Sequence, residues 1–365
     1  MSWRNILLIG FCLLLNYSLA VAQEISINKN LEKIKINGTE QWLEINTQDE
    51  KLPVLLILHG GPGFSMMNLF HDINPDLEKH YTVVDWDQRG AGRSYSANIY
   101  DYTMTLEQFI DDGHQVTLWL KKRFPTHPKI YLLGHSWGTM LGMMLVKKYP
   151  QDYFAYIGTG QVVDCIENEK ESWRLAMAMA KKDNNERAIL ELETIGLPGD
   201  NLQYYNSTLM RWQLQEWNYP PSKREDEITS DWVEKFGGDL KGKKSISEIN
   251  DKLKKYAVYK DIDIEAGRDY SYLLFFDREV TYFNLKKKGL YSSDSYFPKS
   301  LIPIYIFQGV SDGETPYSLA KEYFDSLEAP QKKWVSFEES AHFPFYEEPK
   351  KMLEELLKVK NETLK

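Results

Sequence analysis

The pentapeptide Gly134-His135-Ser136-Trp137-Gly138 is the stretch whose residue types most directly predict chemistry. It follows the apolar run 130–133 and precedes residues 139–148, which have the composition of a helix. A serine between two glycines at a strand-to-helix turn is typical of a nucleophile elbow, because glycine permits the sharp turn that exposes the hydroxyl. We therefore predict that Ser136 is a nucleophile.

A glycine-rich loop earlier in the chain is suited to bind a developing negative charge. The apolar run 54–58 ends in His59-Gly60-Gly61-Pro62-Gly63. Glycines directly after a buried strand allow backbone amides to approach a substrate closely. We expect an oxyanion hole formed by the amide of Gly61, or of Gly60, together with that of Trp137, the residue after the serine.

Two residues that would complete a serine-dependent mechanism follow late strands. Asp312 comes after the apolar run 302–307, and His342 comes after the run 334–337. The chain order serine, aspartate, histidine is typical of a triad in which the histidine takes the serine proton and the aspartate fixes the imidazole tautomer. We therefore predict Ser136, Asp312 and His342 as the catalytic residues.

A second carboxylate is an alternative for the acid of this site. Asp164 follows the strand predicted over residues 153–163, and a carboxylate there would also reach the histidine. We prefer Asp312, because it lies in a tight glycine-flanked turn one strand before His342. The other histidines of the chain do not follow a late strand.

The elements around these residues predict an α/β fold. Residues 32–36 and 42–45 carry apolar residues at alternate positions around Asn37-Gly38, which predicts an antiparallel hairpin. Strand and helix patterns then alternate, and this order predicts a mostly parallel sheet with helices on both faces. The further predicted strands are 54–58, 81–86, 130–133, 153–163, 302–307 and 334–337, and the helices between or after them are 106–124, 139–148 and 349–359.

The middle of the chain has a different pattern. Between residues 164 and 300 the buried-strand runs stop and helical periods replace them, notably at 173–182, 187–195, 231–236 and 248–259. A helical segment inserted between two parts of one sheet is expected to form a cap that shapes the substrate pocket. We therefore predict a core made of residues 23–163 and 301–365, with a helical cap at 164–300.

The first 22 residues have the parts of a secretory signal peptide. Arg4 precedes the apolar stretch 6–15, and Ala20-Val21-Ala22 has the small residues of a cleavage site. The apolar stretch is short for a membrane span. We expect cleavage near Ala22, export to the periplasm or the medium, and no stable membrane insertion of the mature chain. An uncleaved membrane anchor is the alternative.

Composition and motif spacing argue against several partners and cofactors. The 365-residue chain has a formal net charge of −9, which disfavours nucleic acid as its main partner. The loop 87–94 matches neither common nucleotide-binding spacing, and we interpret it as a structural loop whose Arg89 or Arg93 pairs with a local carboxylate. No H-E-x-x-H or paired-cysteine pattern occurs, so neither a metal nor another cofactor is expected. The oligomeric state is not predicted.

Taken together, the motifs resemble those of the proline iminopeptidase branch of the α/β-hydrolases. The resemblance is carried by His59-Gly60-Gly61-Pro62-Gly63, Asp87-Gln88-Arg89-Gly90-Ala91-Gly92-Arg93-Ser94 and Gly134-His135-Ser136-Trp137-Gly138, followed by Asp312 and His342. It implies the α/β-hydrolase fold with an inserted helical cap. It also implies an aminopeptidase that releases an N-terminal residue, typically proline, from a small peptide through an acyl-enzyme.

The resemblance further implies that cap glutamates bind the free amino terminus of the substrate. Glu216, which lies beside Trp212 and Trp217, is one candidate, and Glu279 is another. The alternative interpretation, which we prefer, is that either residue is a solvated charge on a helix surface. The reaction class is therefore better defined than the substrate, because the cap determines specificity.

Two other functions remain open. A carboxylesterase or lipase-like enzyme would cleave small acyl esters with the same residues, because ester and amide cleavage share this machinery. A non-catalytic binding protein on a hydrolase scaffold is the third hypothesis. A haloalkane dehalogenase or an epoxide hydrolase is disfavoured, because those relatives have an aspartate where Ser136 stands.

Overall fold

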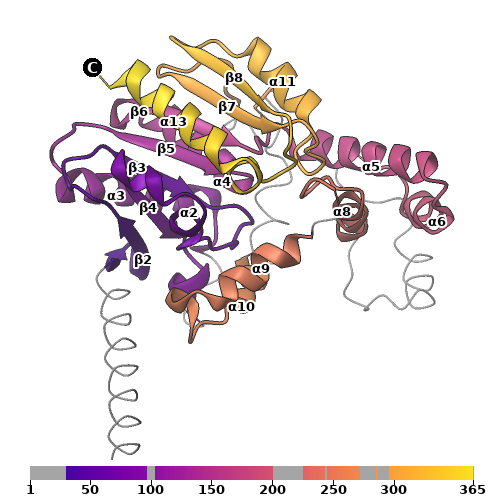
Figure 1. The fold of residues 1–365 in the computed structure, drawn as a ribbon, viewed down its shortest axis with the longest axis horizontal. Helices are drawn as coiled ribbons and strands as arrows, with labels where there is room; N and C mark the ends of the chain where they lie inside the picture. The colour runs from indigo at the N-terminus through magenta and orange to yellow at the C-terminus, as the bar shows by residue number, and fades with distance from the viewer. Residues whose placement is uncertain are drawn as a thin grey trace, which may run out of the picture.

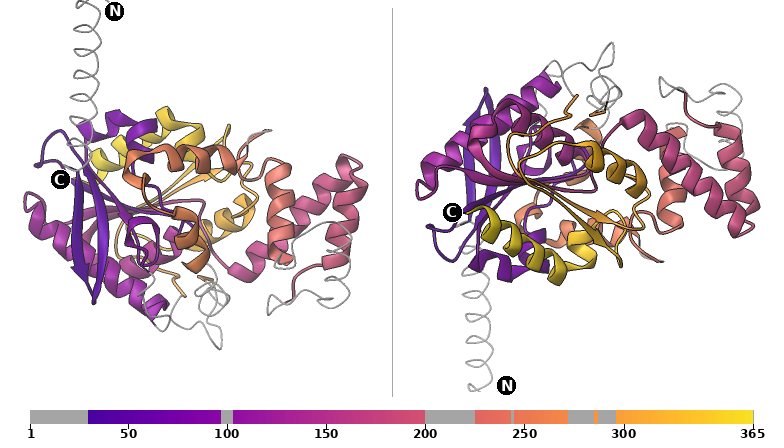
Figure 2. Two further views of the ribbon diagram at one scale, coloured as in Figure 1. Left: turned by 90° about the horizontal axis from the view of Figure 1, so that it is seen from below. Right: turned by 90° about the horizontal axis from the view of Figure 1, so that it is seen from above.

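The computed structural model describes residues 30–96, 103–199, 225–242, 245–271, 285–286 and 296–364 of the chain. The predicted signal segment 1–22 and the two candidate amine-binding residues Glu216 and Glu279 lie outside the described residues. Figures 1 and 2 show the described elements as a twisted central sheet covered by helices, with a further group of helices to one side.

The eight strands that the structure describes form one sheet in the order β1-β2-β4-β3-β5-β6-β7-β8 (Figure 1). β1 and β2 form the predicted antiparallel hairpin, with Asn37 and Gly38 at positive φ angles of 47° and 83° in its turn. From β4 to β8 each neighbouring pair in the sheet is parallel. The strands are β1 (Leu31–Ile36), β2 (Thr39–Asn46), β3 (Val54–Leu58), β4 (Thr82–Asp87), β5 (Ile130–His135), β6 (Tyr153–Thr159), β7 (Ile304–Gly309) and β8 (Lys332–Phe337).

Helices cover both faces of the sheet, and each face has its own apolar cluster. The helices of one face are α3 (Leu106–Arg123), α4 (Trp137–Lys148) and α11 (Tyr317–Ser326), and those of the other are α2 (Leu69–Ile73), α12 (Pro344–Glu347) and α13 (Pro349–Thr363). The central strands β3, β4, β5 and β7 are buried at every position, which explains their nearly continuous apolar sequences. The predicted α/β fold is confirmed.

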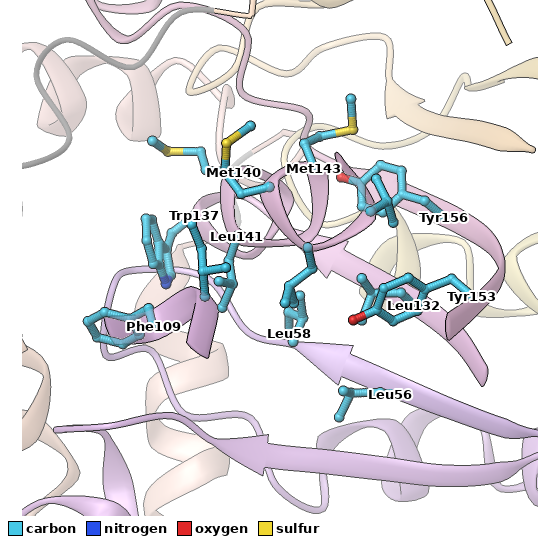
Figure 3. Close-up of a cluster of buried hydrophobic side chains, with 14 of the residues drawn as sticks. Leu56, Leu58, Phe109, Leu132, Trp137, Met140, Leu141, Met143, Tyr153 and Tyr156 are labelled. Carbon is cyan, nitrogen blue, oxygen red and sulfur yellow. The ribbon is translucent and has the colours of Figure 1, made fainter. Parts of the chain in front are cut away.

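The helix that follows the predicted nucleophile is fixed by the core. α4 is buried at each residue from Trp137 to Val146. Figure 3 shows Leu141 of this helix above Leu58 of β3, and Trp137 beside Phe109 of α3. The rings of Trp137 and Phe109 pack edge to face with centroids 5.6 Å apart. Since each large apolar side chain buried in this way contributes about 1.5–3 kcal/mol, the beginning of α4 is firmly held.

The cap helices divide into two groups. α5 (Cys165–Lys182), α6 (Glu186–Ile195) and α8 (Glu225–Lys235) surround a small apolar cluster of their own. α9 (Ile246–Lys255) and the short helix η5 (Ala257–Tyr259) instead join the core cluster on the α13 side of the sheet, next to α10 (Ile264–Ser271). Figure 1 shows the two groups apart from each other. In the part of the chain that the structure describes, no helix is both long and apolar enough to cross a bilayer.

Two predicted boundaries near Asp164 were wrong. β6 ends at Thr159 and not at residue 163, because Gly160 turns the chain with a φ of 58°. The next helix begins at Cys165 and not at residue 173, because the Asp164 side chain accepts two hydrogen bonds from N–H groups of the first turn. Periodicity alone did not locate this start, since the first turn contains mainly polar residues.

Candidate active site

Ser136 occupies the turn between β5 and α4. Its backbone has φ 52° and ψ −121°, and a positive φ is rare for a residue with a side chain. Its N–H donates a 3.0 Å hydrogen bond to the carbonyl of Thr159 in β6. A Cβ atom at Gly134 would lie 2.4 Å from the Gly138 carbonyl oxygen, and one at Gly138 would lie 2.1 Å from that of Leu58. Both glycines are therefore required for the tight turn that presents the serine.

Asp312 and His342 meet on loops that follow β7 and β8. The Nδ1 atom of His342 lies 3.0 and 3.1 Å from the two carboxylate oxygens of Asp312. The same carboxylate accepts bonds from the backbone N–H groups of Glu314 and Thr315 and from the side chains of Gln308 and Thr315. A carboxylate surrounded by donors acts as the acceptor, so the neutral form of His342 carries its proton on Nδ1 and has Nε2 available as a base.

Nearby charges strengthen His342 as a base. Burial by itself would lower the pKa of His342, but the charge and hydrogen bond of Asp312, with the carboxyl groups of Asp239 and Glu314, raise it to about 9. The backbone N–H of His342 also donates to the backbone carbonyl of Asp239 at 2.9 Å, which fixes the histidine backbone beside these acids. A cation bound near Asp239 and Glu314 would offset their charge and lower the pKa of His342.

Asp164, the alternative acid, has a different place in the structure. Its Oδ1 atom accepts hydrogen bonds from the N–H groups of Ile166 and Glu167 at 3.1 and 3.2 Å and caps α5. The carboxylate within hydrogen-bonding distance of His342 Nδ1 is that of Asp312. The structure thus brings together Asp312 and His342, the pair that the sequence favoured.

Hydrogen bonds of His59 fix the direction of one peptide group in the loop after β3. The N–H of Gln88 donates to His59 Nε2 at 3.2 Å, so Nδ1 of this histidine carries the proton and donates to the Gly60 carbonyl at 2.8 Å. Burial lowers the pKa of His59 to about 4, which keeps the ring neutral near pH 7. Because the C=O and N–H of a trans peptide point in opposite directions, the Gly61 N–H points away from His59. Gly60 and Gly61 line the same pocket as Ser136.

Gln88 links the two predicted halves of the oxyanion hole. Its Nε2 atom donates to the His59 carbonyl at 3.2 Å, and its Oε1 atom accepts from the indole N–H of Trp137 at 2.9 Å. Gln88 is only 1% exposed, so water does not compete for these bonds. Sequence reasoning missed this residue, although its position directly after β4, between the two predicted oxyanion loops along the chain, was a usable signal.

Arg89 forms the local ion pair expected of the loop 87–94. Its Nε and Nη2 atoms donate to the two carboxylate oxygens of Asp112 in α3 at 2.8 and 2.9 Å, and both side chains are fully buried. Arg93 takes another role, since its N–H donates to Asp87 and its Nη1 donates to the Val258 carbonyl of the cap. The loop therefore joins the sheet to α3 and to the cap.

A pocket of about 290 Å³ lies over Ser136 and His342. Its described lining also includes three acidic residues, which are Glu234 of α8, Asp239 in the loop after α8, and Glu314 two residues after Asp312. Sequence reasoning did not select any of the three. The short spacing from Asp312 was a signal for Glu314, whereas nothing in the cap pattern distinguished Glu234 or Asp239 from solvated charges.

The buried acids of this pocket have raised pKa values, although His342 lies beside them. Burial, followed by the charge of Glu314, raises the pKa of Asp239 well above its ordinary value. Burial also raises the pKa of Glu314, against the opposing effects of His342 and of the Ser230 hydroxyl, which donates to Glu314 at 3.0 Å. A cationic ligand group would be stabilised here. Among the described residues, no group of three or more His, Cys, Asp or Glu side chains is arranged to hold a metal ion.

Comparison with known proteins places the chain among hydrolases. Residues 53–185 match the family model described as alpha/beta hydrolase fold. The probable aminopeptidase YbaC of Bacillus subtilis (strain 168) is 30% identical over 321 residues, which cover 87% of this chain and 92% of the relative. A proline iminopeptidase of Clostridioides difficile (strain 630) is 28% identical over 316 residues, which cover 85% of this chain and 90% of the relative.

A solved structure extends the comparison to the fold. The crystal structure of a proline iminopeptidase of Mycobacterium smegmatis has a TM-score of 0.55 to this chain at 16% identity, covering 92% of this chain and 99% of the other. At that identity the likeness concerns the fold alone. The similarity to the Bacillus subtilis relative extends over both the core and the cap. The chain therefore belongs to the α/β-hydrolase family, among its proline iminopeptidase-like members.

Proposed function

We propose that this protein is an exported serine aminopeptidase, of the proline iminopeptidase type, that releases N-terminal residues from small peptides. Ser136 attacks the carbonyl of the first peptide bond while His342 takes the serine proton, and Asp312 holds the imidazole. The N–H groups of Gly61 and Trp137 stabilise the oxyanion, and the latter lies at the positive end of the α4 dipole. His342 then protonates the leaving amine, and water hydrolyses the acyl-enzyme.

The observation that carries this proposal is the acidic side of the pocket that contains Ser136 and His342. In a peptide with a free amino terminus, the ammonium is attached to the carbon next to the scissile carbonyl. It must therefore lie within a few ångströms of the attacking serine. Glu234, Asp239 and Glu314 place carboxyl groups there, and pairing with an ammonium favours their ionised forms, so the site prefers an ammonium group to a neutral ester or a blocked amine.

The proposal of export rests on the N-terminal pattern. Arg4, the apolar stretch 6–15 and Ala20-Val21-Ala22 have the order of a cleavable signal peptide. We expect the mature protein to begin near Gln23, which N-terminal sequencing of the protein recovered outside the cytoplasm would establish. Recovery with residues 1–22 intact in the membrane fraction would support the retained anchor instead.

The decisive assay compares free and blocked amino termini. The mature protein is given alanine and proline p-nitroanilides with a free or an acetylated amino group, and acetylation is expected to lower kcat/KM by about 100-fold or more. Glu234→Gln and Glu314→Gln should each reduce the ratio of kcat/KM between the free and the acetylated substrate. Glu328→Gln, which removes an exposed surface charge paired with Lys299, is the matched control and should leave it unchanged.

Other outcomes would favour the alternatives. Rapid cleavage of acyl esters, with no turnover of any amide, would indicate a carboxylesterase. Failure of a fluorophosphonate to label Ser136, together with unchanged ligand binding by Ser136→Ala, would indicate a binding protein. Equal cleavage of free and acetylated substrates would show that the acidic residues do not select substrates with a free amino terminus.

A further inference from the structure

The pocket over Ser136 also contains a positive side chain, to which the proposed mechanism assigns no role. Arg268 of α10 lines the pocket together with Asn250 of α9. The Nη1 atom of Arg268 donates to Asn250 Oδ1 at 3.2 Å, which connects the two side chains. One small pocket thus combines three acidic residues and an arginine around the same serine.

Among the residues that the structure describes, the charge of Arg268 is only weakly compensated. Its Nη2 atom lies 3.9 Å from Glu265 Oε1, and that oxygen lies 2.7 Å from the ammonium of Lys254. A guanidinium has five N–H donors in a planar fork, of which the bond to Asn250 uses one. Arg268 therefore keeps the capacity to bind a carboxylate with two parallel hydrogen bonds.

Packing places α10 directly against the oxyanion loop. A Cβ atom at Gly63 would lie 2.8 Å from the Cα of Arg268, so helix and loop are in close contact. At the other end of the loop, a Cβ atom at Gly60 would lie 3.2 Å from that of Ser136. Arg268 is therefore positioned beside the loop that would hold the scissile carbonyl.

α9 contacts both the acidic and the basic part of the pocket. Glu234 accepts hydrogen bonds from the Ser245 hydroxyl and the Ile246 N–H at the N-terminus of this helix. Asn250, which contacts Arg268, lies four residues after Ile246, and four residues of α-helix span about 6 Å. An extended dipeptide measures about 7 Å from its ammonium to its carboxylate. The rise of α9 between its contact with Glu234 and its contact with Arg268 is thus of the order of a dipeptide's length.

We infer that the pocket is built for dipeptides with a free carboxyl group. The ammonium lies among Glu234, Asp239 and Glu314, and the carboxylate of the second residue binds Arg268. A volume of about 290 Å³, just below the range of about 300–1,000 Å³ for ligand pockets, suits a substrate of this size. The inference rests on the proposed aminopeptidase function and narrows its substrate class.

The reaction is a balanced hydrolysis. Ser136 Oγ bonds to the carbonyl carbon of the first residue, the C–N bond breaks, and His342 passes the serine proton to the departing amino group. Water then attacks the ester, and its proton returns through His342 to Ser136. The products are two free amino acids. The second leaves with the carboxylate that Arg268 binds.

The test measures kcat/KM for prolyl-alanine, prolyl-alanine amide and proline p-nitroanilide. The free dipeptide is expected to exceed its amide by about 10- to 100-fold, the range of a charge-assisted hydrogen bond. Arg268→Gln should bring this ratio close to 1, mainly through a higher KM, because the carboxylate is bound equally before and during the reaction. Arg268→Lys should keep part of the ratio. Arg174→Gln, at an exposed position on α5, is the matched control and should keep all of it.

The possible outcomes separate the two proposals. Equal kcat/KM for dipeptide and amide in the native protein, or an unchanged ratio in Arg268→Gln, would overturn the dipeptide assignment, and p-nitroanilide cleavage would still support an aminopeptidase. If no substrate with a free amino terminus is cleaved, both proposals fail. Should Arg268→Gln not fold, calorimetric binding of prolyl-alanine and its amide to Ser136→Ala gives the same comparison, and equal affinities would refute the role of the carboxylate.

Discussion

Replacing Gln88 with methionine tests whether the predicted oxyanion hole depends on a side chain outside the predicted triad. Methionine has a similar volume but cannot bridge the His59 carbonyl and the Trp137 indole N–H, which Gln88 contacts at 3.2 and 2.9 Å. The backbone bond from Gln88 N–H to His59 Nε2 remains in the variant. The change therefore removes the connection between the two oxyanion loops and leaves each loop in place.

The size of the effect follows from burial. His59 and Trp137 are each 2% exposed, so neither freed group regains a hydrogen bond to water. Leaving a buried polar group unpaired costs about 1–3 kcal/mol, so the two freed groups in Gln88→Met should lower the free energy of unfolding by about 2–6 kcal/mol. Complete loss of one oxyanion donor lowers kcat by about 100- to 1,000-fold. A displaced donor should cost less, and we expect kcat to fall about 10- to 100-fold with little change in KM.

A matched variant separates catalysis from stability. Gln41 is another buried glutamine that accepts a 2.9 Å bond from a tryptophan, Trp86, but it lies on β2, whose residues do not line the pocket. Gln41→Met should reduce stability by a similar amount and leave kcat nearly unchanged. The measurements are urea unfolding and steady-state kinetics on both an anilide and an acyl ester, since the oxyanion hole serves both reactions.

A double-mutant cycle with Trp137→Phe completes the test. If the bond between the two side chains carries the effect, the losses in Gln88→Met and Trp137→Phe will overlap, with a coupling of about 1 kcal/mol. A Gln88→Met protein that loses stability as expected but keeps the native kcat would refute the idea that this network aligns the oxyanion donors. Its role would then be structural only.

Three further predictions concern the same site. Ser136→Ala should abolish fluorophosphonate labelling and lower kcat by about 10⁴-fold or more while the unfolding curve stays near that of the native protein. Glu314→Gln removes a negative charge that raises the pKa of His342. Because activity depends on neutral His342, the acidic limb of the kcat/KM profile should move to lower pH by about 0.5–1 unit. A shift to higher pH would contradict this sign. Arg89→Met should lower the free energy of unfolding by about 3–5 kcal/mol in chemical denaturation, because it leaves Asp112 as a buried unpaired charge, and Arg89→Met combined with Asp112→Leu should recover part of that loss.

The core was largely predictable because its sequence signals are local. Buried parallel strands need continuous apolar runs, and the carboxyl ends of such strands meet at one edge of the sheet. The residues after β3, β5, β7 and β8 therefore had to come close together, and the structure places Gly61, Ser136, Asp312 and His342 there. The α3 prediction was accurate to one residue for the same reason, since its apolar period is regular.

The cap was less predictable because no sheet relates its residues to the serine. Glu234 faces the pocket because α8 packs on α5 and α6, and Asn250 does so because α9 joins the core cluster. Both placements depend on packing between helices that are far apart in the chain, and a hydrophobic period specifies only which face is buried. The start of α5 was missed for a different reason, since a capping aspartate and not apolar periodicity determines it.

The turn after β7 contains both Asp312, which was predicted from the sequence, and Glu314, which was not. Asp312 Oδ1 accepts the N–H groups of Glu314 and Thr315, so the carboxylate that orients His342 also fixes the backbone that presents Glu314 to the pocket. The base and one group of the proposed ammonium site are thereby held by the same few residues, and movement of the cap helices would not alter their relative position. An ammonium bound there offsets the charge that raises the pKa of His342. Binding of the substrate would therefore increase the fraction of neutral imidazole at the moment when a base is needed.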